Sequence, residues 1–207
     1  MANTPPVLSN PPIHRRLTRL DALSEVLRVV HLTGGVFLEA AFTAPWSVLA
    51  QVRSEDCYPT MTQPAAIVCF HYVVDGRMVL QVGEAAPIEV GAGAIIMLPH
   101  NDTHTLASAP GLPPMNAHHL IQLQREGVLG RIDYGGGGAA TLIICGFIGS
   151  EARRHPLVEA LPRVLTLDLN GRREADWIAS SFRFAAQEVA ADRPGSAGHR
   201  RLADGRD

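Results

Sequence analysis

The sequence predicts a mainly β domain, a sandwich or barrel, with helices at both ends of the strand-rich region. Between residues 36 and 149, short segments rich in β-branched and other apolar residues alternate with turns that contain Gly, Pro, Asn and Asp. Many short strands joined by such turns are typical of sandwiches and barrels. Helical spacing of apolar residues appears only before and after this region.

The first elements expected are a leader and one helix. Residues 1–19 begin with a proline-rich stretch, which predicts a flexible leader. Leucines and valines then recur at helical spacing, and glycines at 34 and 35 end the pattern. A helix is therefore predicted over residues 21–31.

The strand-rich part and this helix form one predicted domain, residues 20–150. The expected strands cover residues 36–42, 46–52, 65–74, 77–83, 88–91, 94–98, 103–107, 118–124 and 141–149. Two interruptions, a proline-rich stretch (107–116) and four consecutive glycines (135–138), are expected to be surface loops.

The pattern becomes helical again in residues 151–193. A short helix is predicted within residues 155–165 and ends near Pro162, and a longer amphipathic helix is predicted over 173–191. Residues 194–207 lose all apolar periodicity and are expected to form a disordered tail.

Composition and charge argue against several classes of protein. A net charge of −2 gives no general attraction for nucleic acid or for an anionic membrane. The longest apolar runs fall short of the ~20 residues that span a bilayer, and prolines interrupt the place of a signal peptide's apolar segment. We therefore expect a cytoplasmic protein without membrane contact, whose three cysteines stay reduced.

Residues 93–104 match the second sequence motif of the cupins, G(x)5PxGxxH. Gly93, Pro99 and His104 are in place, and Asn101 stands where the family has glycine. The substitution is mild because asparagine is the next-best residue for a left-handed turn. This resemblance implies a cupin-type β-barrel, a double-stranded β-helix of the jelly-roll kind, with His104 pointing into the barrel as a metal ligand.

The first cupin motif, which ends HxH(x)3-4E(x)6G, is present only in part. Gly76 matches its glycine, Cys69 stands where the family has glutamate, and the HxH pair is absent. His71 lies two residues from Cys69, so on a strand both side chains point to the same face. The usual metal triad is therefore broken, and a different set of donors could replace it.

More of the sequence is similar to one branch of the family, the cupin-type N-terminal sensor domain of AraC-type bacterial transcriptional regulators. The matching pieces run in order over residues 20–196: LDALSEVLRVV, APW, FHYVVDGRMVL, VGAGAIIMLPHNDTHTL, the glycine run before TLIICGFI, HPLVEALPRVLTL and EVAADRPGS. Such domains bind a small molecule or sense a chemical stress, and they usually dimerise through helices outside the barrel. The resemblance therefore implies a small-molecule effector and either a homodimer or a heterodimer with a full-length regulator.

The DNA-binding part of such a regulator is missing from the sequence. A pair of helix-turn-helix units would follow RPGS, whereas this sequence ends shortly after it. No segment has two short helices around a glycine turn with a basic recognition face. We expect that this chain does not read DNA by itself.

His71, His104 and Cys145 are the predicted metal ligands. In the cupin arrangement their strands can converge at one end of the barrel, and imidazole nitrogen with thiolate is a donor set suited to zinc. A fourth position would be left for water, Cys69 or a ligand. The alternative is that all three are buried residues of an apolar barrel, where cysteine is common and a histidine bonds to a carbonyl.

Three residues are predicted to line a ligand cavity: Cys69, Trp46 and His119. Cys69 could instead be a fourth metal ligand, a redox-responsive thiol or a packed thiol. Plain core packing is the alternative for Trp46. His118 and His119 are adjacent, so on a strand only one of them faces inward, and a surface position is the alternative for either.

Two functions follow from these features. The first is a non-catalytic sensor in AraC-type transcriptional control. The second is a metal-dependent cupin enzyme, a dioxygenase or isomerase, in which an ion activates water or oxygen. The absent HxH pair and the cysteine at the glutamate position argue against the enzyme, because open iron sites favour two histidines and a carboxylate.

Overall fold

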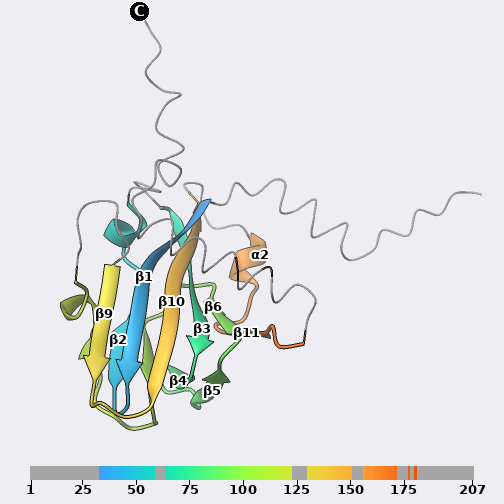
Figure 1. Ribbon diagram of the computed structural model, residues 1–207. Helices are drawn as coiled ribbons and strands as arrows, with labels where there is room; N and C mark the ends of the chain where they lie inside the picture. Colours follow the sequence, from blue (N-terminus) through green and yellow to red (C-terminus); the bar gives the residue numbers. More distant parts are fainter. Residues whose placement is uncertain are drawn as a thin grey trace, which may run out of the picture. The chain divides into compact units, whose positions relative to one another are not determined.

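The computed structural model describes residues 33–58, 64–122, 130–150 and 156–171, together with residues 177 and 180. These residues form two β-sheets (Figure 1). The predictions of a leader, of a helix over 21–31 and of a tail concern residues outside the described ones. Of the helix predicted over 173–191, only residues 177 and 180 are described, and both are helical.

The larger sheet has six strands in the order β11-β6-β3-β10-β1-β9. In chain order they are β1 (Thr33–Thr43), β3 (Ala66–Asp75), β6 (Ala94–Leu98), β9 (Gly130–Gly135), β10 (Ala140–Ser150) and β11 (Leu165–Asp168). The long strand β10 is antiparallel to both β1 and β3, and the three lie side by side in Figure 1. This central strand positions the interior residues on both of its neighbours.

The smaller sheet has five strands in the order β5-β4-β7-β2-β8. They are β2 (Ser47–Ala50), β4 (Arg77–Val82), β5 (Ile88–Gly91), β7 (His104–Ala107) and β8 (Met115–Asn116). Three short helical elements are also described: the 3-10 turns η1 (Ser54–Cys57) and η2 (Ala117–His119), and the α-helix α2 (Pro156–Glu159). Among the described residues, no helix has both the length and the apolar character needed to cross a bilayer.

One apolar core joins the two sheets. On β10 of the larger sheet, Ile143, Cys145 and Phe147 alternate into it, and on β4 of the smaller sheet Met78 and Leu80 do the same. Because burial of apolar surface is the dominant favourable term in folding, this alternation fixes which face of each strand points inward. The prediction of a mainly β fold is confirmed for the described residues.

All but one of the expected strands are present. The prediction of a strand over 118–124 is wrong at its start, where η2 forms instead. The side chain of Asn116 accepts a hydrogen bond from the backbone N–H of His118, and this local cap competes with strand pairing. Strands β8, β9 and β11 were not predicted, and β8 falls in the stretch 107–116 that was expected to be a loop. All three lie at sheet edges, β9 and β11 in the six-stranded sheet and β8 in the smaller one, and they are short or carry polar residues at alternate positions, which weakens the apolar signal.

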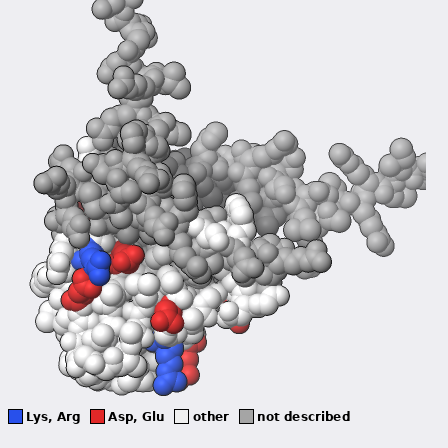
Figure 2. All heavy atoms as spheres, in the orientation of Figure 1, with Lys and Arg blue, Asp and Glu red and all other residues white. Residues whose placement is uncertain are grey.

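The surface carries no extended patch of one charge on the face drawn in Figure 2. Its described acidic and basic side chains lie next to one another, with uncharged surface between the groups. Charges of mixed sign are typical of a solvated surface.

Candidate metal site

Three buried side chains of kinds that can ligate a metal come from both sheets and meet in the core between them. Cys69 and His71 lie on β3, and their side chains share one face because they are two residues apart on a strand. His104 begins β7 on the opposite sheet. Only 1% of Cys69, 2% of His71 and 1% of His104 is exposed, so each polar group needs a partner within the protein.

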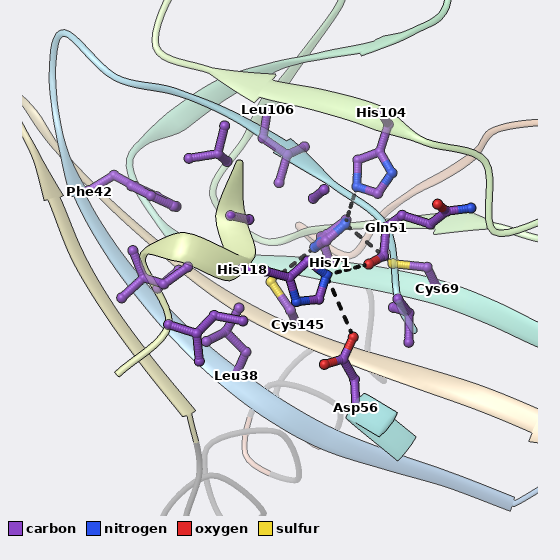
Figure 3. A pocket seen from close by; sticks show the side chains of 17 residues that line it. Leu38, Phe42, Gln51, Asp56, Cys69, His71, His104, Leu106, His118 and Cys145 are labelled. Carbon is purple, nitrogen blue, oxygen red and sulfur yellow. Dashed lines mark hydrogen bonds and ion pairs between the residues drawn. The ribbon is translucent and has the colours of Figure 1, made fainter. Parts of the chain in front are cut away.

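The two histidine rings meet nitrogen to nitrogen (Figure 3). His71 Nε2 lies 2.8 Å from His104 Nε2 and 3.4 Å from the Sγ atom of Cys69. The ligand atoms of these three residues all lie within 4.8 Å of one another, and the group could hold a metal ion.

The turn that carries His104 is held by Asn101. Asn101 has a φ of 51°, in the left-handed region. Its side-chain N–H donates to the backbone oxygen of Val52 at 2.7 Å, and its Oδ1 accepts from the Val52 N–H at 3.2 Å. His104 Nδ1 lies 2.8 Å from the backbone oxygen of Asp102. A carbonyl only accepts, so in the neutral ring Nδ1 carries the hydrogen and Nε2 presents its lone pair.

Cys145 lies next to this group but on the other side of the His71 ring. It pairs with His71 across β10 and β3, and its Sγ atom is 3.0 Å from His71 Nδ1. The structure therefore places His71 against both His104 and Cys145, while the group whose ligand atoms all lie within 4.8 Å of one another contains Cys69 and not Cys145. The donor group that faces one point is Cys69, His71 and His104.

Burial keeps this group uncharged. Burial, and after it the neighbouring His104, lowers the pKa of His71 well below its ordinary value. Burial also lowers the pKa of His104, against the opposing effect of Asp102. The thiols respond in the other direction: burial raises the pKa of Cys69 well above its ordinary value and that of Cys145 to about 12. These shifts favour two neutral imidazoles and a neutral Cys69 thiol in the group, with the neutral Cys145 thiol beside it, an arrangement that avoids a buried charge.

The cavity beside the group is small and mostly apolar. It measures about 30 Å³, and its apolar wall includes Leu38, Phe42 and Leu106. A cavity needs roughly 10–15 Å³ to hold one water molecule, so this one has room for little more than a water-sized group. An organic molecule would have to push the walls apart.

Three polar residues, Gln51, Asp56 and His118, line one part of the cavity. His118 Nε2 lies 3.2 Å from the backbone oxygen of Gln51 and 3.9 Å from Asp56 Oδ2. Asp56 is the one carboxylate among the described residues that line the cavity, and burial raises its pKa. Of the two adjacent histidines, the sequence analysis assigned His119 to the cavity, whereas in η2 it is His118 that lines it.

The other two predicted cavity residues lie elsewhere. Trp46 is buried and stacks on Phe42, with ring centroids 4.1 Å apart, so a residue of the cavity wall separates it from the space. His119 is exposed and does not line the cavity, because the 3-10 turn directs it away from its neighbour His118. Neither placement supports a ligand contact.

Comparison with known proteins gives a family match. A family model described as cupin matches residues 21–204 of this chain. No curated protein matches the chain.

Solved structures that match part of this chain include the protein ToxT of Vibrio cholerae. Its apo K231A form matches with a TM-score of 0.38 and 8% identity, over 78% of this chain and 50% of that one. A ToxT structure with bound unsaturated fatty acid matches with a TM-score of 0.32 and 10% identity, over 78% of this chain and 55% of that one. This chain thus spans about half the length of those structures.

Proposed function

Because the chain belongs to the cupin family, we propose that it is a non-catalytic sensor domain of an AraC-type transcriptional regulator, and that its barrel site holds zinc. The buried group of Cys69, His71 and His104 carries this proposal. The resemblance of residues 20–196 to the sensor branch of the family supports the regulatory role.

Zinc fits this group by the chemistry of its donors. Zinc takes thiolate and imidazole ligands in four-coordinate sites, and sites that keep one position open use three protein ligands. Two neutral imidazoles and one thiolate would hold the ion, which would supply a positive charge that offsets the ionised Cys69 thiol. The three residues line a cavity of about 30 Å³, which would accommodate a water or a similarly small donor.

The donor set favours sensing over catalysis. Open iron sites in oxygenases use two histidines and a carboxylate. Here the third donor is Cys69, and Asp56, the carboxylate of the cavity lining, is not a member of the group. A cavity of about 30 Å³ also gives little space for an organic substrate beside an ion. In this proposal the sensed species is therefore the ion itself or a small ligand that completes its coordination.

The signal would pass through the turn before His104. Arg163 donates two hydrogen bonds to the carboxylate of Asp102, at 2.9 and 3.1 Å, and Asp102 accepts from the ring of His104 through its backbone oxygen. His100 Nε2 in the same turn lies 3.0 Å from the backbone oxygen of Leu161. Occupancy of the site would bias the chain that follows residue 161, provided that the ion binds one arrangement better than the other.

A thermal melt tests the proposal. The protein is stripped with a chelator, and its melting temperature is followed as zinc is added. A ligand at a hundred times its Kd stabilises the folded state by about 2.7 kcal/mol, so the wild type is expected to gain several degrees. Cys69→Ser and His104→Gln are expected to lose the gain. His119→Gln, which changes an exposed histidine outside the cavity, serves as the matched control and is expected to keep it.

Two results would contradict the proposal. If zinc leaves the wild-type melting temperature unchanged, the site does not bind it. If iron or manganese binds in preference to zinc and the loaded protein turns over a substrate, the chain is an enzyme of the dioxygenase or isomerase kind.

A further inference from the structure

The two buried thiols beside His71 hold opposite nitrogens of one ring. Cys145 Sγ is 3.0 Å from Nδ1, and Cys69 Sγ is 3.4 Å from Nε2. The two nitrogens of an imidazole point in different directions, so a single ion cannot take His71 and both thiols as ligands. His104 Nε2 lies 2.8 Å from His71 Nε2, on the same side of the ring as Cys69. An ion held by both histidines would therefore have Cys69 as its third ligand, and Cys145 would not bind it.

The hydrogen atoms in the metal-free site follow from the partners. The backbone oxygen of Asp102 only accepts, so His104 carries its hydrogen on Nδ1 and accepts at Nε2. His71 must then donate to His104 through Nε2–H. Its Nδ1 is left as an acceptor, and the thiol of Cys145 is the group in reach that can donate to it. Every nitrogen of the two rings has a partner in this arrangement.

An ion at Nε2 requires the opposite arrangement on the His71 ring. The nitrogen that binds the ion must give up its hydrogen, so the neutral ring carries it on Nδ1 instead. The Sγ atom of Cys145 then accepts a hydrogen bond from His71 Nδ1–H, whereas in the metal-free protein its thiol donates one to Nδ1. A carboxylate or carbonyl at this position could only accept, and it would leave two lone pairs facing each other at 2.8 Å in the metal-free protein. A thiol can do both, although weakly.

We infer that Cys145 is the positioning residue of the site: it holds His71 through Nδ1 and serves both hydrogen arrangements of the ring without binding the ion. This inference rests on the proposed function. The hydrogens balance, because His71 loses one at Nε2 and gains one at Nδ1 while the thiol hydrogen of Cys145 turns away. The one proton released to solvent comes from Cys69.

Cobalt(II) in place of zinc shows which thiol is the ligand. A thiolate bound to cobalt gives a charge-transfer absorption band in the near ultraviolet. The band is expected in the wild type and in Cys145→Ser, and it is expected to vanish in Cys69→Ser. Cys145→Ser keeps a group that donates and accepts, so it is the conservative variant.

Zinc affinity measures the positioning role. Loss of a partner that orients a metal-binding histidine typically costs 10–100-fold in affinity, and this loss is expected for Cys145→Ala. Cys145→Ser is expected to stay within a few-fold of the wild type. Cys57→Ala removes another buried thiol, one that donates to the backbone oxygen of Arg53 outside the cavity, and is expected to bind zinc normally. Nitrogen-15 NMR of the wild-type His71 ring should show its hydrogen move from Nε2 to Nδ1 when zinc is added.

The results separate this inference from the proposed function. If the wild type binds neither zinc nor cobalt, both are overturned. If it binds them and the cobalt band disappears in Cys145→Ser, then Cys145 is a ligand and the inference alone is overturned. The inference also falls if Cys145→Ala binds zinc as tightly as the wild type.

Discussion

Asn101 has two roles in the turn before His104: it adopts a left-handed backbone conformation, and its side chain hydrogen-bonds to Val52. The sequence predicted only the first. Its position in the cupin motif predicts a left-handed backbone, and the observed φ of 51° agrees. The paired hydrogen bonds with Val52 could not be predicted, because that partner lies 49 residues away in the sequence. Spacing within a motif reports local backbone conformation, whereas such a contact depends on how distant segments pack.

Replacing Asn101 should separate these two roles. Asn101→Gly keeps the backbone conformation but removes two hydrogen bonds, each worth about 1 kcal/mol, so a loss of about 1–2 kcal/mol in unfolding free energy is expected. Asn101→Ala adds the cost of a left-handed residue with a Cβ, about 1 kcal/mol more. Urea denaturation measures both variants. Equal stability of the glycine and alanine variants would show that the backbone conformation costs nothing here.

The buried histidines should make the metal-free protein sensitive to acid. The pKa values of His71 and His104 are lowered in the folded state, so below pH about 6.5 the unfolded chain binds more protons than the folded one. Stability should therefore stay level above pH 6.5 and fall as the pH decreases below it, by up to about 1.4 kcal/mol per pH unit for each histidine. Urea denaturation in the presence of a chelator measures this slope. His104→Gln should have a shallower one, and an unchanged slope would contradict the assignment.

The elements that were predicted correctly are those whose apolar residues face the core. Strands β3, β4 and β10 show this pattern along most of their length, and the expected ranges match them within a few residues. The missed strands β8, β9 and β11 lie at sheet edges, where each pairs with one strand of its sheet. Their pairing comes from the rest of the sheet and leaves little trace in their own residues.

Strand β10 contains a glycine at a place of close packing. A Cβ on Gly146 would lie 2.5 Å from the backbone oxygen of Gly35 on β1 and closer still to the ring of Phe70 on β3. The Gly35 backbone cannot move away from the added Cβ, because β10 is paired with β1 on one side and with β3 on the other.

Gly146→Ala should therefore destabilise the sheet. Overpacking of a tight interior typically costs 1–3 kcal/mol, and about the upper end of that range is expected. Gly91→Ala is the matched control, since Gly91 also lies on a strand but nothing stands within 4 Å of its added Cβ. The control should stay within about 0.5 kcal/mol of the wild type. Similar losses in both variants would point to a general cost of losing glycine rather than to the contact.

At the scale of the whole molecule, the sequence predicted which side chains lie in the barrel interior, but not which of the two cysteines lies on the His104 side of the His71 ring. The cupin motifs placed His104 and Cys69 in the barrel, and the shared face of β3 added His71. The choice between Cys69 and Cys145 depends on which nitrogen of the His71 ring each thiol meets. That choice is set by the orientation of one ring between β3, β7 and β10, which residue spacing does not specify.

An ion pair between Arg163 and Asp102 links the site to the C-terminal part of the described chain. Arg163 reaches Asp102 with both arms of its guanidinium group, and His104 hydrogen-bonds to the backbone oxygen of that residue. We call the contact between Arg163 and Asp102 the clamp. If the clamp couples residues 161–169 to the site, zinc binding must in turn stabilise those residues, because coupling between two equilibria is reciprocal. Zinc should then slow amide hydrogen exchange in residues 161–169.

Arg163→Gln should weaken zinc binding several-fold while changing the melting temperature of the metal-free protein little, because exposed ion pairs contribute little to stability. Arg131→Gln is the matched control: Arg131 makes the same two-armed contact, with Asp133 on β9, at 2.7 and 3.2 Å and away from the site. Zinc titration followed by hydrogen exchange compares the two variants. If both bind zinc as the wild type does, the clamp holds the chain in place without passing a signal, and the route from the barrel must run through another contact.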